Sequence, residues 1–132
     1  MPANHKDILK NIKIILLVDW PNTDVPKSLL NAGFIVFSYS PDEYTVISQT
    51  GGGKLVFSKL DEQPTSVDLV NVYRPEAEHA AIIDKHVLAL NAKVLWLHPP
   101  VVSANTAVIA AEHGIVFVEG IDITEVVRTL NK

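Results

Sequence analysis

The feature that most constrains the fold is a series of short, almost uninterrupted apolar runs. Residues 13–18 (KIILLV), 67–73 (VDLVNVY) and 93–97 (KVLWL) are apolar at most positions. A strand with one face in solvent alternates apolar and polar side chains, whereas a continuous apolar run is typical of a strand buried on both faces. The runs therefore predict a sheet that has helices packed on each side.

Helical stretches separate these strands. Residues 24–32, 76–90 and 104–113 have helical patterns, and the last of them lies between Ser103, a good N-cap residue, and Gly114, a residue that ends helices. Strands that alternate with helices pair in parallel through right-handed crossovers. We therefore predict an α/β fold, a three-layer Rossmann-like domain with a mostly parallel sheet.

The segment after the first of these helices contains turns rather than a nucleotide loop. Residues 34–39 (FIVFSY) predict a strand that ends at Ser40 and Pro41, because proline cannot donate to a strand ladder. The three glycines at 51–53 are followed by lysine, but a phosphate-binding loop needs the pattern G-x-x-x-x-G-K-[ST] before a helix. Residues 55–57 (LVF) have a strand pattern instead, so we predict a turn between two strands.

Length and composition bound the class of protein. The 132 residues (14.5 kDa) are 48% hydrophobic and 20% charged, which predicts a single globular domain over residues 1–132. The sequence contains no cysteine, which excludes disulfides, thiolate metal ligands and cysteine nucleophiles. The net charge is −4 and the basic residues are scattered, so we expect no nucleic-acid partner.

Two further absences bear on the location of the protein. No apolar run approaches the roughly 18 residues of a membrane span, and residues 1–12 lack the apolar core of a signal peptide. We therefore expect a cytoplasmic protein with no membrane partner.

The predicted topology also indicates where a ligand would bind. In parallel α/β sheets the ligand crevice lies beyond the carboxyl ends of the strands, where the strand order reverses. This rule selects the loops at 19–23, 74–75 and 98–102, with the turn after residue 39 beside them. The expected ligand-binding residues are Asp19, Trp20, Asn22, Ser40, Pro41, Tyr73, Arg74, His98 and Val102. We assign no catalytic residue.

The charged and aromatic residues of these loops leave alternatives open. Arg74 could hold a phosphate or carboxylate with its two-pronged guanidinium, or form a structural ion pair with Asp19 or Glu76. Asp19 could act as a base, a ribose partner or a metal ligand, or it could cap the following helix or pair with Arg74. Trp20 could stack on an adenine or pack against the protein.

The histidines support a weaker set of expectations. His98 follows a strand at the crevice, so we expect it to contact a ligand. His79 and His86 flank the predicted apolar stripe of their helix, about 10 Å apart, which is too far to share a metal ion. We predict no metal site. Ile82 is expected outside the stripe, beside these two histidines, and this charge-poor patch predicts a homodimer interface.

Several segments resemble one family of proteins. VDLVNVYRPEAE (67–78) resembles the pattern V-D-[IL]-V-[DN]-V-[FY]-R-x-x-E, and residues 92–118 resemble A-K-V-[VL]-W-x-Q followed by a helix and a strand. Residues 53–64 and 7–18 are similar to further segments in the same order. On these motifs the chain resembles the small stand-alone CoA-binding proteins, which are Rossmann-like and related to the CoA-binding domain of succinyl-CoA ligases. The resemblance implies CoA as cofactor and a ligand-contacting role for His98.

The resemblance fails at the phosphate loop. The family's first strand ends in a turn similar to V-G-A-S, whereas this chain has Val18, Asp19, Trp20 and Pro21 and a shorter loop. Asp19 adds a negative charge where a pyrophosphate needs N–H donors, and Pro21 removes one donor. The turn after the second strand, N-P-x-Y-like in the family, is also altered. We therefore expect CoA to bind weakly or not at all.

Three functions follow from these observations. The first is a non-catalytic CoA- or nucleotide-binding module whose ligand has drifted or been lost. The second is a degenerate Rossmann-like scaffold that acts through protein–protein contacts without a nucleotide. The third is an enzyme that uses Asp19, His98 and Arg74 at one crevice, which requires those three side chains to contact one another.

Overall fold

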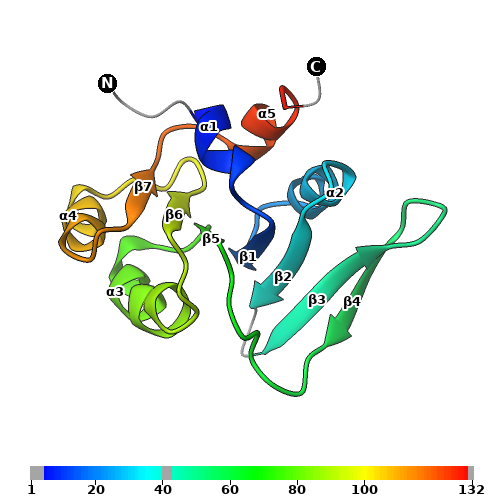
Figure 1. The fold of residues 1–132 in the computed structure, drawn as a ribbon, viewed down its shortest axis with the longest axis horizontal. Helices are drawn as coiled ribbons and strands as arrows, with labels where there is room; N and C mark the ends of the chain where they lie inside the picture. The colour runs from blue at the N-terminus through cyan, green and yellow to red at the C-terminus, as the bar shows by residue number, and fades with distance from the viewer. Residues whose placement is uncertain (1–4, 40–42, 131–132) are drawn as a thin grey trace.

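The computed structural model describes residues 5–39 and 43–130 (Figure 1). The strands are β1 (Ile14–Val18), β2 (Ile35–Tyr39), β3 (Tyr44–Gln49), β4 (Leu55–Lys59), β5 (Leu69–Val72), β6 (Val94–Leu97) and β7 (Val116–Val118). The helices are α1 (His5–Lys10), α2 (Asp24–Asn31), α3 (His79–Ile82), α4 (Ala104–Glu112) and α5 (Ile123–Val127). A 3₁₀ turn (Glu76–Glu78) precedes α3, and a π-helical segment (Ile83–Leu88) continues it.

The described strands form one seven-stranded sheet in the order β4-β3-β2-β1-β5-β6-β7. Strands β2, β1, β5, β6 and β7 run parallel, whereas β3 and β4 pair antiparallel at one edge. The chain builds outward from β1 to β4 and then returns to β5 on the other side of β1 (Figure 1). The strand order therefore reverses between β1 and β5, and their carboxyl ends, at Val18 and Val72, mark the crevice.

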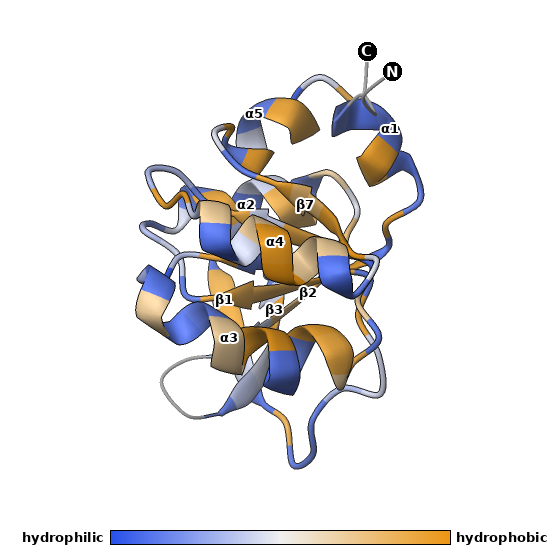
Figure 2. Ribbon diagram, turned by 90° about the vertical axis from the view of Figure 1, so that its left-hand side faces the viewer, coloured by the Kyte–Doolittle hydropathy of each residue, from blue (hydrophilic) through white to orange (hydrophobic). Residues whose placement is uncertain are grey.

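Helices cover both faces of the parallel strands. On one face, α1, α2 and α5 pack against the sheet through Leu9, Val25, Leu29, Ile123, Val126 and Val127. On the other face, α3 with its π-helical continuation and α4 pack through Ile82, Ile83, Val87 and Ala110. In Figure 2, α3 and α4 lie in front of the strands, whereas α1 and α5 lie together at the top. The predicted three-layer Rossmann-like α/β fold with a mostly parallel sheet is confirmed.

The predicted turns and caps agree with the structure. The Ser103 side chain accepts a hydrogen bond from the Thr106 N–H at 3.0 Å and so caps α4. Gly114 follows α4 with a φ of 70°, a left-handed conformation that glycine adopts without strain. The glycine triplet forms the expected turn between β3 and β4, which the Gly53 N–H closes by donating to the Thr50 carbonyl at 2.9 Å.

The buried stripe of the 76–90 segment differs from the prediction. His79, Ile82 and His86 are buried, each less than one-tenth exposed, whereas Ala80 is exposed. The prediction treated the histidines as polar flanks, but both rings have hydrogen-bond partners within the fold and therefore tolerate burial. The prediction of an exposed dimer-interface patch around Ile82 is therefore wrong. Dimer formation stays a prediction, without this surface.

The burial of Ile82 gives a first prediction. Ile82→Glu places a carboxylate in the apolar layer between α3 and the sheet, so we expect the free energy of unfolding to fall by about 3 kcal/mol or more. Val108→Glu is the matched control, because Val108 on α4 is 57% exposed, and its effect should stay within about 0.5 kcal/mol. Urea unfolding followed by circular dichroism measures both. Wild-type stability in Ile82→Glu would show that this face of α3 is not buried.

Candidate functional site

Asp19 shapes the turn that follows β1. Its φ of 66° is a left-handed conformation, uncommon outside glycine, although aspartate adopts it more readily than most residues. Its carboxylate supports the turn, because Oδ1 accepts a hydrogen bond from the Trp20 backbone N–H at 2.9 Å. Asp19 therefore supplies the conformation that glycine readily adopts, at the position where the resembling family has glycine.

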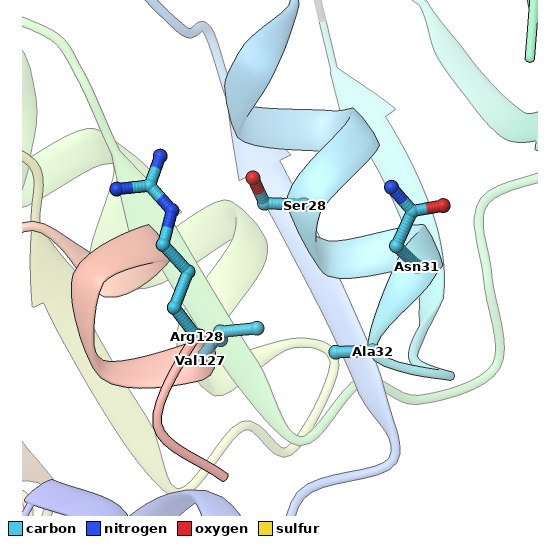
Figure 3. A pocket seen from close by; sticks show the side chains of 5 residues that line it. All are labelled: Ser28, Asn31, Ala32, Val127 and Arg128. Carbon is cyan, nitrogen blue, oxygen red and sulfur yellow. The ribbon is translucent and has the colours of Figure 1, made fainter. Parts of the chain in front are cut away.

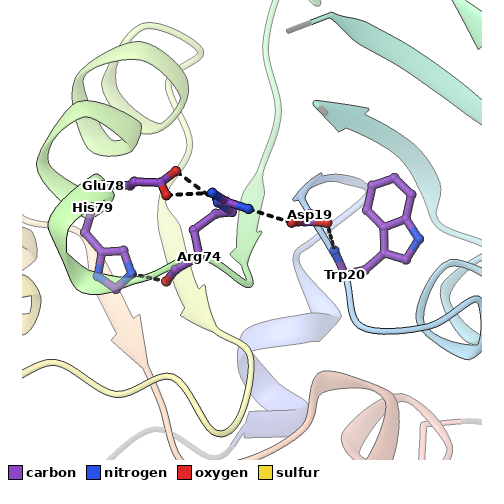
Figure 4. A network of polar contacts seen from close by, with 5 residues as sticks. All are labelled: Asp19, Trp20, Arg74, Glu78 and His79. Carbon is purple, nitrogen blue, oxygen red and sulfur yellow. Dashed lines mark hydrogen bonds and ion pairs between the residues drawn. The ribbon is translucent and has the colours of Figure 1, made fainter. Parts of the chain in front are cut away.

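Arg74, just beyond β5, bridges this turn to the start of the α3 segment (Figure 4). Its Nη1 donates to Asp19 Oδ2 at 3.0 Å, and its Nε and Nη2 donate to the two carboxylate oxygens of Glu78 at 2.9 and 2.6 Å. The Glu78 and Asp19 carboxylates raise the pKa of Arg74, and Arg74 in turn lowers the pKa of Glu78. All three side chains are a third or more exposed, so each ion pair stabilises the fold by about 1 kcal/mol or less.

The structure contains one of the two ion pairs that the sequence suggested for Arg74. The partner Asp19 is confirmed, whereas Glu76 is not a partner; it accepts a hydrogen bond from the Ser103 hydroxyl instead. The 3₁₀ turn after Pro75 brings Glu78, four residues after Arg74, to the guanidinium. Arg74 thus already pairs with two carboxylates, and these compete with an anionic ligand for the guanidinium.

His79 holds the backbone of Arg74 in place through a hydrogen bond. Its Nε2 donates to the Arg74 carbonyl at 2.8 Å (Figure 4). Its Nδ1 shares a hydrogen bond with the Thr106 hydroxyl of α4, also at 2.8 Å. The histidine that we expected at the surface therefore joins β5, α3 and α4.

The amino end of α2 offers few free donors to an anion. The first-turn amides donate within the turn: Asp24 to Asn22 Oδ1, Val25 to the Asn22 carbonyl and Lys27 to the Thr23 carbonyl. Residue 26 is proline, which has no N–H. In the described part of the chain, the backbone N–H groups of Asn22 and Thr23 remain without a partner. A phosphate at this helix end therefore meets an incomplete set of donors.

Trp20 and Val102 occupy peripheral positions. The Trp20 ring stacks on Phe57 of β4, with ring centroids 5.8 Å apart and an angle of 6° between the ring planes. The structure thus shows the packing alternative for Trp20, which also packs against the core on the α2 side. Stacking on an adenine stays a prediction. Val102 is exposed, and Ser40 and Pro41 lie outside the described residues.

His98 is buried just beyond β6, which pairs with β5 on the side away from β1, and it lies beside the polar side chains of Asn71 and Asp122. Its Nε2 is 3.8 Å from Asp122 Oδ2, its Nδ1 is 3.5 Å from Asn71 Nδ2, and the Tyr73 ring meets it edge-on. Burial lowers the pKa of His98, and Asp122 partly opposes this effect. No direct contact joins His98 to Asp19 or Arg74 in the described residues, so the three residues of the enzyme hypothesis do not form one cluster.

Sequence reasoning missed Asn71 and Asp122 as neighbours of His98. Asn71 is fully buried in β5, and its Oδ1 is the one described buried side-chain oxygen or nitrogen without a hydrogen-bond partner. The signal was present, because asparagine interrupts the apolar run VDLVNVY. Asp122 caps α5, where its Oδ1 accepts a hydrogen bond from the Thr124 N–H at 2.8 Å.

A cavity of about 200 Å³ opens beside the Arg74 bridge, on the α3 side of the sheet. Its lining residues are Val18, Asp19, Tyr39, Arg74, Glu78, Ile82 and His86. Tyr39 and His86 face each other with ring centroids 4.4 Å apart, and the Tyr44 hydroxyl lies 2.6 Å from His86 Nδ1. Sequence reasoning did not place Tyr39, Tyr44 or His86 at the crevice, since they come from β2, β3 and the π-helical segment.

A second hollow, of about 290 Å³, lies between α2 and α5 (Figure 3). Ser28, Asn31 and Arg128 contribute its polar groups, and Ala32 and Val127 its apolar floor. It adjoins the carboxyl-terminal half of α2, whereas the crevice lies at the amino end of that helix. We therefore do not place the ligand there.

The described residues lack two further features. No group of three or more histidine, aspartate or glutamate side chains in ranges 5–39 and 43–130 is arranged to hold a metal ion. Within those same ranges, no helix has the length and apolar character needed to cross a bilayer.

Comparison with known proteins decides the family. Residues 18–121 match the sequence profile of a CoA binding domain. The chain belongs to this family of CoA-binding domains. The match begins at the last residue of β1, so it includes the Asp19 turn, the Arg74 bridge and His98. The family assignment supports a CoA-binding module.

Solved structures of small proteins share the fold of this CoA-binding domain. One from Thermus thermophilus, called cell-free ID.343, has a TM-score of 0.73 at 21% identity, over 97% of this chain and 99% of that one. Prb, a protein redesigned for binding, has a TM-score of 0.72 at 20% identity, over 98% and 93%. A hypothetical protein from Pyrococcus horikoshii OT3 has a TM-score of 0.70 at 18% identity, over 98% and 94%. At these identities the likeness concerns the fold alone.

The buried His86 predicts how the stability of the domain depends on pH. Burial, and to a lesser extent Lys85, lowers the pKa of His86 from 6.5 to about 4. Between these values the unfolded chain binds a proton that the folded chain does not, so acid favours unfolding. The stability is therefore complete above about pH 6.5 and falls by up to about 3 kcal/mol as the pH approaches 4.

Urea unfolding at pH values above and within this window measures the effect. His86→Gln removes the titrating group, so the stability of this variant should depend less steeply on pH. The pH dependence that remains comes partly from His98, because burial also lowers the pKa of that residue. His113→Gln is the control, because His113 is exposed at the end of α4. If His86→Gln kept the full pH dependence of the wild type, His86 would not be a buried neutral group.

Proposed function

We propose that this domain is a non-catalytic module that binds a CoA-type or other nucleotide ligand across the carboxyl ends of β1 and β5. The family match over residues 18–121 carries the proposal. The position of Arg74 supports it, because the side chain stands where the strand order reverses.

The hydrogen-bond donors and the charges at the crevice indicate how well its residues fit CoA. The left-handed turn at Asp19 and the unpaired amides of Asn22 and Thr23 suit a phosphate. Against this, Asp19 brings a negative charge to the turn. Its carboxylate also accepts hydrogen bonds from the Trp20 N–H and from Nη1 of Arg74. The site fits a nucleotide in outline and fits its phosphates poorly. The affinity for CoA should therefore be weak, with a dissociation constant well above micromolar.

Asp19→Gly tests the proposal directly. Glycine adopts the φ of 66° without strain, and its introduction removes the charge and releases both the Trp20 N–H and one side of Arg74. We expect Asp19→Gly to bind CoA and dephospho-CoA at least ~10-fold more tightly than the wild type, about 1.4 kcal/mol. Isothermal titration calorimetry provides the measurement.

Two further variants serve as controls for Asp19→Gly. Asp19→Asn removes the charge but keeps an acceptor for Trp20, and it should fall between the wild type and the glycine variant. Arg74→Ala in the glycine background should abolish binding while the domain remains folded, because the side chain is 40% exposed. Absence of CoA binding in Asp19→Gly at millimolar ligand would refute the proposal. Submicromolar binding by the wild type would show instead that the Asp19 turn accepts phosphates.

A specific observation favours one alternative function. Arg74 and most amides at the amino end of α2 already have partners within the protein. A scaffold that has lost its ligand and acts through protein–protein contacts needs no free donors there. If neither the wild type nor Asp19→Gly binds CoA or any nucleotide, this scaffold becomes the better explanation.

A further inference from the structure

One edge of the sheet lies far from the crevice and has no neighbouring strand. Strand β4 pairs with β3 on one side, and no described strand pairs with its other side (Figure 1). Four of its five residues are exposed. An edge strand of this kind presents unpaired N–H and C=O groups to which another strand can bond.

The register with β3 shows which backbone groups face outward. The Thr50 N–H donates to the Lys54 carbonyl, and the Leu60 N–H donates to the Tyr44 carbonyl, so the even-numbered residues of this segment face β3. In an antiparallel ladder, successive residues direct their N–H and C=O groups to opposite sides. The residues of β4 that direct these groups to the free edge are therefore Leu55, Phe57 and Lys59.

The edge is apolar on both faces of the sheet. Phe57, 44% exposed, lies on the α2 side, where it stacks on Trp20, and Val56, 38% exposed, lies on the opposite side. Natural proteins commonly protect an exposed edge with charged side chains or proline. Within β4 the only such residue is Lys59, at the end of the strand. Most of this edge is therefore open to pairing.

The charges around β4 favour a second copy of the same strand as the partner. Lys54 precedes β4, and Asp61 and Glu62 follow it; all three are exposed. None of the three forms an ion pair with another described residue. In an antiparallel pair, the basic start of one strand lies beside the acidic end of the other. A two-fold axis makes this match at both ends of the interface.

We propose that two copies of this chain associate by antiparallel pairing of their β4 strands, with the two-fold axis at Phe57. In this register Phe57 lies opposite Phe57 of the second copy, and Leu55 lies opposite Lys59. All the outward-facing residues then exchange backbone hydrogen bonds, and Lys54 lies beside Asp61 of the second copy. A register centred on Lys59 is disfavoured, because it places two lysines opposite each other.

Phe57 is already ordered for this contact. Its ring stacks on Trp20, with ring centroids 5.8 Å apart and an angle of 6° between the ring planes. A side chain that is ordered before association loses less entropy when the partner binds. Association through β4 involves no ligand and is independent of the proposed function.

Hydrogen exchange of the wild-type protein, followed by nuclear magnetic resonance, tests the pairing residue by residue. As the protein concentration rises, the amides of Leu55, Phe57 and Lys59 should exchange at least ~10-fold more slowly. The amides of Val56 and Ser58 should change little, because they face β3 in the single chain as well. Association without this alternating pattern would overturn the pairing through β4.

Sedimentation measures the association itself. The mass should rise with concentration toward twice the 14.5 kDa of one chain. Phe57→Lys places two lysines opposite each other at the axis and should weaken association at least ~10-fold. Val116→Lys is the matched control, because Val116 is also 44% exposed but lies on β7, at the opposite edge of the sheet; it should associate like the wild type.

Thermal unfolding verifies that both variants are folded. A wild-type chain that stays monomeric at millimolar concentration would overturn the proposal. Equal association of the Phe57→Lys and Val116→Lys variants would also overturn it.

An exchange of charges tests the antiparallel direction. Lys54→Glu places a carboxylate beside Asp61 of the second copy and should weaken association. Lys54→Glu combined with Asp61→Lys restores opposite charges and should recover most of the wild-type affinity. Both positions are exposed, so neither change should unfold the domain. A double variant that associates no more tightly than Lys54→Glu alone would contradict the proposed register.

Discussion

The crevice of this domain depends on one guanidinium that bridges two carboxylates. Arg74 joins the turn after β1, through Asp19, to the beginning of the α3 segment, through Glu78. This contact links the two halves of the sheet at the point where the strand order reverses. It also occupies the cation that is best placed to bind an anion. The same interaction therefore supports the fold and limits what the site can bind.

Asp19 separates the crevice into two unequal parts. On the α2 side, Trp20 packs against the core beneath α1, α2 and α5, and most backbone N–H groups at the amino end of α2 already donate hydrogen bonds within the turn. On the α3 side, Tyr39 and Tyr44 pack against the core beneath α3 and α4, and Tyr39 and His86 line a cavity beside Arg74. A nucleotide ligand would thus meet an incomplete set of phosphate donors on one side and a cavity lined by Tyr39 and His86 on the other.

The sequence predicted the scaffold well because the scaffold follows from local patterns. Uninterrupted apolar runs indicated the buried strands, and Ser103 and Gly114 marked the ends of α4. The expectation that failed concerned residues whose environment is set by distant parts of the chain. His79 and His86 were assigned to the surface, because their partners Thr106 and Tyr44 are 27 and 42 residues away. The cavity was missed for the same reason, since β2 and the π-helical segment supply its two rings, Tyr39 and His86.

The central claim is that a CoA-type ligand binds at the carboxyl ends of β1 and β5 once Arg74 is released from Asp19. A crystal structure of the domain grown with a high concentration of CoA tests this most directly. We expect ligand density across the ends of these two strands, with the Arg74 guanidinium turned from Asp19 toward a phosphate oxygen. A crevice without ligand density at saturating CoA, or bound CoA with both ion pairs of Arg74 intact, would contradict the account.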